Sequence, residues 1–250
     1  MATSLKIRLF QTTFFGSILA LWYGVTETGY VSPIFLPTLP DLATKFFNLV
    51  KSGEWITPLS ITLYEVACAY SIAVLSGIFI GFLVSRTKFA TRVFEPLFSS
   101  LFAIPLIIFY PLAMLFFGLG VGSKIALGSV VSFFPIVLNT ISGFGTVSPI
   151  YQRAAHSMGA SGFLLIRRVL LPAAFPVILT GLRIGFIVCF LSIIGGETLG
   201  SLDGLGHRIV FNAESMNTSG MFAWIIFIVL IAFGLNITVQ RLEKRGEHYK

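Results

Sequence analysis

The 250-residue chain has a hydrophobic share of 56%, a charged share of only 11% and a formal net charge of +7. A water-soluble domain carries about 25% charged residues because its surface faces water, so this composition excludes an ordinary soluble protein. It predicts a single domain, residues 1–250, embedded in a lipid bilayer, and the apolar content argues against nucleic acid as the partner of the positive charge.

Six apolar stretches are long enough, or nearly so, to cross a bilayer core, which takes about 20 helical residues. They lie at residues 9–25, 59–84, 97–117, 125–144, 173–195 and 221–239. Backbone groups in lipid must be paired within their own segment, which favours helices, and the stretches lack the period-two alternation of a transmembrane barrel. The predicted fold class is therefore all-α, a polytopic transmembrane bundle of six spans.

The connection after the first stretch predicts a short amphipathic helix on the outer membrane surface. Thr38 has the position of a helix cap with Asp41 three residues on, apolar residues then recur at helical spacing, and Gly53 follows. Thr57 and Pro58 have the pattern of the cap and first residue of the second span.

Prolines interrupt the third and fourth stretches, and a polar connection follows the fifth. Pro105, Pro111 and Pro135 predict bent helices, either as simple bends or as walls beside a solute pathway. The glycine-rich connection at 196–220 is expected to be an outer loop.

The distribution of basic residues predicts the orientation. Twelve Lys and Arg fall in the two tails and in the connections after spans 2 and 4, whereas the opposite side carries four. The four on the opposite side are Lys45, Lys51, Lys124 and Arg208. Since cytoplasmic segments are enriched in Lys and Arg, both termini should be cytoplasmic.

The connection at residues 149–172, called here the coupling segment, predicts a compact helix–turn–helix. Pro149 can begin a short helix, Gly159 can supply a left-handed turn, and a second short helix would lead to Pro172 at the entry to span 5. Its basic character suits docking into a groove of a cytoplasmic partner, although a solvated loop has the same composition.

The coupling segment resembles the motif that binding-protein-dependent ABC import permeases use to contact their ATPase. The motif pairs two alanines with a glycine four residues later and ends in an apolar–x–Leu–Pro sequence. The matching residues are Ala154, Ala155, Gly159, Val169, Leu171 and Pro172. Arg153 stands where the motif has Glu, and the resemblance implies contact roles for Arg153 and His156 in this chain.

Other segments resemble the nitrate/sulfonate/taurine-type branch of that family. They are Val31-Ser32-Pro33, Leu36-Pro37, Phe117-Gly118-Leu119-Gly120, Ser123-Lys124, Phe134-Pro135-Ile136 and Leu179-Thr180-Gly181-Leu182-Arg183. The branch implies an anion or small organic solute, and sulfonates, taurine, nitrate, bicarbonate and pyrimidine-type vitamin precursors all remain open.

The resemblance implies a permease subunit in a bacterial inner membrane, working with partners. These are two cytoplasmic ATPase subunits, a second permease copy (identical or related) and an extracytoplasmic solute-binding protein. No Gly-x-x-x-x-Gly-Lys-Ser/Thr phosphate loop occurs in this chain, so ATP and Mg are expected in the ATPase and no cofactor in the permease.

Four polar residues in the spans are candidates for the translocation pathway: Arg183, Glu197, Asn139 and Ser192. A charge in a span is costly and usually faces the bundle interior or a wet cavity. Arg183 either sets the field for an anionic solute, pairs structurally with a residue such as Glu65, or extends to the interface. Asn139 and Ser192 can equally serve helix–helix contacts.

Catalysis and metal binding are not expected. Paired carboxylates, a histidine cluster and a nucleophile–base pair are all missing from the spans, and Cys68 and Cys189 lie in apolar runs without zinc-site spacing. The alternative to an ABC permease is an ATP-independent channel or secondary transporter, or a scaffold subunit, none of which explains the coupling segment.

Overall fold

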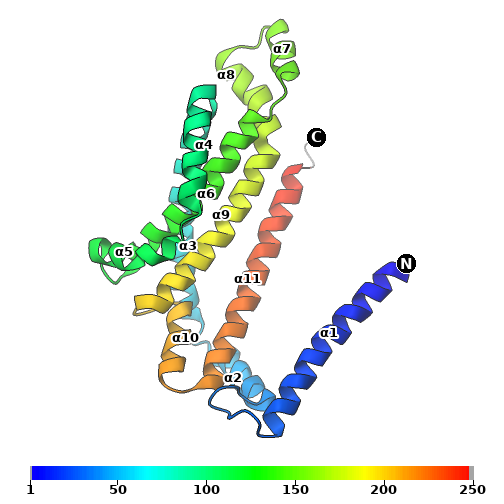
Figure 1. Ribbon diagram of the computed structural model, residues 1–250, viewed down its shortest axis with the longest axis vertical. Coiled ribbons are helices and arrows are strands. Elements are labelled where there is room, and N and C mark those ends of the chain that lie inside the picture. Colours follow the sequence, from blue (N-terminus) through cyan, green and yellow to red (C-terminus); the bar gives the residue numbers. More distant parts are fainter. Residues whose placement is uncertain (1, 248–250) are drawn as a thin grey trace.

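The computed structural model describes the backbone of residues 2–247 and the side chains of residues 6, 7 and 9–241, and each regular element in this part is helical (Figure 1). In chain order the elements are α1 (Ala2–Glu27), α2 (Leu39–Ser52), α3 (Ile56–Ser85), α4 (Lys88–Phe102), η1 (Leu106–Phe109), α5 (Tyr110–Phe117), α6 (Val121–Gly145), α7 (Pro149–Ser157), α8 (Gly162–Leu165), η2 (Ile166–Leu170), α9 (Leu171–Gly200), α10 (Leu205–Glu214) and α11 (Thr218–Glu247). The all-α prediction is confirmed.

The centre of the fold is a three-helix layer in which α6 packs along both α3 and α9. Glycines on α3 and α9 allow these two helices to approach α6 closely. A Cβ atom at Gly81 of α3 would lie 2.6 Å from Thr140 Cβ, and one at Gly185 of α9 would lie 2.7 Å from Ile136 Cγ1. Small residues at such crossings let helix backbones pack closely in lipid, where the hydrophobic effect between helices is absent.

Four helical stretches are long and apolar enough to cross a membrane: Ile56–Ser85, Val121–Gly145, Gly162–Glu214 and Thr218–Arg241. A fifth is obtained only if α4 and Leu106–Phe117 are counted together, and these two meet at an angle of 75°. The third predicted span, at 97–117, is therefore not one straight helix: it divides between α4 and Leu106–Phe117, with a bend where its prolines predicted one. The 26-residue α1 covers the first predicted span, but it is not one of the four stretches.

Proline explains the break in the third span. Pro105 is the residue before η1, and Pro111 lies in the first turn of α5. Proline has no N–H to continue a helix, so helices end before it and restart with it in their first turn. Pro135, by contrast, lies inside the uninterrupted α6.

Three predicted boundaries need correction. α3 begins at Ile56 with Trp55 as the preceding cap residue, because Pro58 is tolerated within a first turn whose N–H groups lack intrahelical partners. α6 begins at Val121, which places Lys124 inside the helix rather than in an outer loop. The predicted loop at 196–220 contains the last turn of α9 and the ten-residue helix α10.

The amphipathic helix predicted after the first span is confirmed as α2. The Thr38 side chain accepts a hydrogen bond from the Asp41 backbone N–H at 3.3 Å, and Gly53 ends the helix with φ +73°. Leu42 and Leu49 are buried, and α2 packs against α11. Part of the apolar face of this helix is therefore buried against the protein itself, whereas Val50 on the same face is exposed.

The two ends of the molecule differ in content (Figure 1). α7 and α8 lie at one end, and α2 and α10 lie at the other. α1 runs from the N-terminus towards α2, and α11 runs back from that end. The α2–α10 end is called here the outer end, following the predicted orientation.

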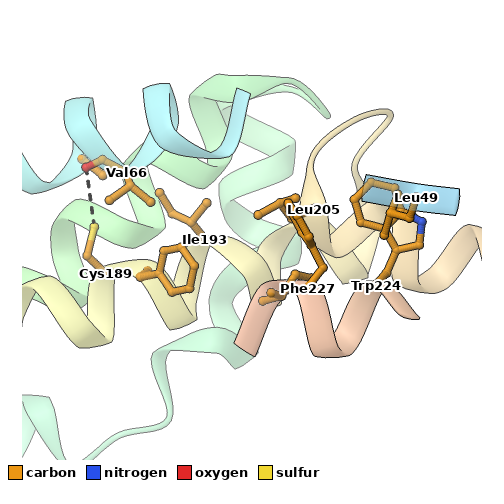
Figure 2. Close-up of a cluster of buried hydrophobic side chains, with 10 residues drawn as sticks. Leu49, Val66, Cys189, Ile193, Leu205, Trp224 and Phe227 are labelled. Carbon is orange, nitrogen blue, oxygen red and sulfur yellow. Dashed lines mark hydrogen bonds between the residues drawn. The ribbon is translucent and has the colours of Figure 1, made fainter. Parts of the chain in front are cut away.

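A buried hydrophobic cluster joins the elements towards the outer end (Figure 2). Leu205, the first residue of α10, is fully buried near Ile193 of α9 and Phe227 of α11. Cys189 Sγ lies 3.9 Å from the Val66 carbonyl of α3. The start of α10 is thus fixed between the neighbouring helices.

Candidate functional site: the coupling segment and the polar residues of the spans

The coupling segment begins with a capped helix and a left-handed glycine. The Ser148 hydroxyl accepts the N–H of Ile150 at 3.3 Å, and Pro149 occupies the first turn of α7. Gly159 has φ +82°, and the N–H of Ala160 donates to the carbonyl of Ala155 at 2.9 Å. This six-to-one bond over a glycine is the usual way to end a helix with a reversal of direction.

After the turn the chain is helical without interruption into α9. Gly162 starts α8, the π-helical η2 follows at Ile166–Leu170, and α9 begins at Leu171. In η2 the Leu171 N–H donates to the Ile166 carbonyl, so the helix is locally widened just before Pro172. Pro172 therefore does not separate a second short helix from span 5, because a widened turn can accommodate the missing N–H.

The coupling segment presents its charges outwards. Arg153, His156, Arg167 and Arg168 are exposed, as are Ala154, Gly159, Leu171 and Pro172. Ala155 is buried, and α7 packs against α8 and η2. The structure therefore places Arg153, Ala154, Ala155 and His156 on α7, Gly159 in the turn after it, and Leu171 and Pro172 at the start of the spanning helix α9.

The four pathway candidates do not form one site. Arg183, Ser192 and Glu197 lie along α9, and the helical rise of 1.5 Å per residue separates Arg183 from Glu197 by about 21 Å. Arg183 and Ser192 are half-buried. Asn139 lies on α6, where its Nδ2 donates to the Pro135 carbonyl at 2.8 Å. A Cβ atom at Gly181 would lie within 2.4 Å of Asn139 Cβ, so Asn139 sits at the α6–α9 crossing.

Glu197 belongs to a buried polar cluster that the sequence did not reveal. Its Oε1 accepts the Thr62 hydroxyl at 2.6 Å, and its Oε2 accepts the Gly206 N–H at 2.7 Å. Next to it, Lys124 Nζ lies 2.5 Å from Glu65 Oε1. Glu65 thus has Lys124 as its ionic partner, instead of the Arg183 considered from sequence. The signal in the sequence was an acidic residue inside the second apolar stretch, which requires a partner.

The cluster is almost closed to solvent. Thr62 and Glu65 are fully buried, Lys124 is 2% exposed and Glu197 is 1% exposed. Buried charges persist only when they are paired, and Lys124 and Glu65 form such a pair. The residues of the cluster come from the three helices α3, α6 and α9. Within the described residues no group of three His, Cys, Asp or Glu could hold a metal ion.

Comparisons with known proteins identify the family. Residues 73–247 match the family described as "Binding-protein-dependent transport system inner membrane component". The chain is 30% identical over 233 residues to the taurine transport system permease protein TauC of Escherichia coli (strain K12), covering 91% of this chain and 85% of the relative. It is also 30% identical to the putative aliphatic sulfonates transport permease protein SsuC of Bacillus subtilis (strain 168), covering 91% and 83%.

The fold agrees with this assignment. A crystal structure of an amino acid ABC transporter with histidines superposes with a TM-score of 0.65 at 24% identity, over 82% of this chain and 98% of that chain. These relatives disfavour the ATP-independent channel considered from sequence. The chain belongs to the binding-protein-dependent transport system inner membrane components, and it is a multi-pass permease subunit of an ABC importer.

Proposed function

We propose that the chain pairs with a second permease copy and two cytoplasmic ATPase subunits to import a taurine- or sulfonate-like anion delivered by an extracytoplasmic binding protein. The observation that carries the proposal is the exposed basic helix α7, which a left-handed glycine and a widened helical turn connect to the spanning helix α9. The names of the relatives supply the solute class.

In this account the coupling segment transmits the motion of the ATPase. ATP and Mg are bound by the partner, and closure of the ATPase pair displaces the docked α7. Because α8, η2 and α9 form one continuous helix, displacement of α7 reorients the outer end of α9. The packed layer of α3, α6 and α9 then rocks and exposes the pathway to the outside.

We place the α7 end in the cytoplasm together with both termini, with α1 as the first of six spans in a single transmembrane domain. Arg153, Arg167 and Arg168 support this placement, since cytoplasmic segments are rich in Arg and Lys. Ser157 ends α7 and Ser215 directly follows α10; both are exposed, and the two helices lie at opposite ends (Figure 1), so the two residues test this placement. In a Cys68→Ala/Cys189→Ala background, an impermeant maleimide added to spheroplasts should label Ser215→Cys and leave Ser157→Cys unlabelled. Labelling of Ser157→Cys alone would reverse the orientation.

We assign Arg183 to the recognition of the anion in the pathway. It is half-buried on α9, and a guanidinium can form two parallel hydrogen bonds to a sulfonate or carboxylate. The half-buried Ser192 lies nine residues farther along the same helix, about 14 Å away and about 2.5 turns round, so it does not share one small anion with Arg183.

Reconstitution tests the proposed function. The chain is co-expressed with its cognate ATPase and inserted into proteoliposomes with ATP inside and the binding protein outside. Labelled taurine should accumulate only with ATP and binding protein, and the mass of the complex should correspond to two permeases and two ATPases. Equal uptake without ATP would establish a channel and overturn the proposal.

A further inference from the structure

The helix α10 is attached to the bundle by an unusual set of polar contacts. α10 lies at the outer end between α9 and α11, after the four-residue linker 201–204 (Figure 1). A short helix on a glycine-containing linker could swing as an independent lid. The contacts around its first turn argue against that.

The first contact is between the start of α10 and the Glu197 carboxylate. The first N–H groups of a helix have no partner within it, and the helix dipole favours an anion there. Glu197 Oε2 accepts the Gly206 N–H at 2.7 Å, so a side chain of α9 supplies that anion from inside the protein. Gly204 and Gly206 make room: a Cβ atom on either would lie within 2.7 Å of a Glu197 atom.

The second contact passes through Thr62 of α3. The Leu205 N–H donates to Thr62 Oγ1 at 3.0 Å, and the Thr62 hydroxyl donates to Glu197 Oε1 at 2.6 Å. One buried hydroxyl therefore joins α3, α9 and the first residue of α10. Both oxygens of Glu197 therefore have a hydrogen-bond partner, Thr62 at Oε1 and the Gly206 N–H at Oε2.

The third contact is made by Lys124 of α6. Its Nζ donates to Ser201 Oγ at 2.8 Å in the linker and pairs with Glu65 of α3. Ser201 Oγ in turn donates to the Asp203 carbonyl. The ammonium thus fixes the linker that α10 would need for independent movement.

From these contacts we infer that Thr62, Lys124 and Glu197, called here the α10 anchor, make α10 move with the α3–α6–α9 layer during transport instead of opening as a separate lid. The inference rests on the proposed function for its transport readout. The three are positioning residues, because they hold the helix and are almost closed to solvent. Removing one charge-assisted hydrogen bond should increase the equilibrium constant for local opening of α10 at least about tenfold.

Hydrogen exchange of the complete complex with its ATPase tests the inference. In the wild type, backbone exchange of residues 205–214 should be equally slow without nucleotide and with ATP trapped by vanadate. Glu197→Gln and Thr62→Val should speed this exchange at least about tenfold and lower the number of solute molecules imported per ATP. Thr62→Ser should restore slow exchange, because it keeps the hydroxyl.

A matched control is available in the same linker. Asp203 is exposed, and only its backbone atoms contact Ser201, so Asp203→Asn removes a nearby charge and leaves the anchor intact. It should exchange and transport as the wild type does. Faster exchange of α10 in the ATP-trapped wild type would overturn the inference, as would unchanged exchange in both Glu197→Gln and Thr62→Val. Slow exchange in a complex that lacks ATP-driven uptake would instead contradict the proposed function and leave the anchor standing.

Discussion

Lys124 Nζ of α6 and Glu65 Oε1 of α3 lie 2.5 Å apart in a region where neither side chain is more than 2% exposed. Removing one partner of such a pair leaves an uncompensated buried charge, which costs about 3–5 kcal/mol. Lys124→Met should therefore lower the thermal melting temperature of the detergent-solubilised protein substantially. The exposed Lys45→Met is the matched control and should melt as the wild type does.

The double variant Glu65→Leu/Lys124→Met separates pairing from packing. Replacement of both charges by apolar groups removes the desolvation cost, so the double variant should recover most of the stability that Lys124→Met loses. A double variant less stable than Lys124→Met would show that the ion pair does not explain the loss.

The close crossing of α6 and α9 can be tested by adding a side chain at Gly185. Gly185→Val would place side-chain atoms against Ile136, where a Cβ already lies 2.7 Å from Cγ1, and overpacking of this kind costs about 1–3 kcal/mol. The melting temperature should fall. Gly234→Val in α11 has nothing within 4 Å of the new Cβ and is the control. Equal losses in both variants would point to the helix backbone instead of the crossing.

Substitution of Gly159 tests how ATP hydrolysis is coupled to solute import. Its φ of +82° costs a residue with a Cβ about 1 kcal/mol or more, whereas nothing lies within 4 Å of that Cβ, so packing is unaffected. Gly159→Val should insert normally and hydrolyse ATP with its partner but import less solute per ATP. Gly159→Asn should lose much less, since Asn tolerates the left-handed region. Wild-type uptake by Gly159→Val would remove this claim.

Substitution of Arg183 tests its proposed role in recognising the solute. Arg183→Gln should raise the solute concentration needed for half-maximal uptake about tenfold, the loss expected for one charge-assisted interaction, with little change in complex assembly. Arg183→Lys should be intermediate because it keeps the charge without the planar fork. Uptake with wild-type rate and affinity in Arg183→Gln would assign Arg183 to structure alone.

Local patterns predicted much of the fold. The apolar lengths identify α3, α6, α9 and α11, and the Thr38 cap and Gly53 identify α2, because capping and apolar length are properties of neighbouring residues. The prolines predicted a bend in the stretch at 97–117, but its size of 75° was not predicted, because apolar length does not reveal the direction of the chain.

The buried polar cluster was missed for a different reason. An acidic residue at position 65, inside an apolar stretch, predicted that a partner exists but did not identify that partner. Lys124 was assigned to the outer loop because the span predicted from hydropathy begins at residue 125, whereas the helix begins four residues earlier, at Val121. Distance from the outer end was the available signal: Lys124 is the fourth residue of α6 and Glu65 the tenth of α3, whereas Arg183 lies 17 residues before the outer end of α9.

The most direct test of the account is a contact between α7 and the ATPase. A photoreactive benzophenone side chain at the exposed position Arg153 should crosslink to the ATPase subunit in membranes, and one at Ser215 on the outer end should not. Crosslinking at Arg153 should change between nucleotide-free and ATP-trapped complexes as α7 moves. If Arg153 gave no ATPase adduct in any nucleotide state of an assembled complex, while Ser215 did, the proposed coupling route would be contradicted.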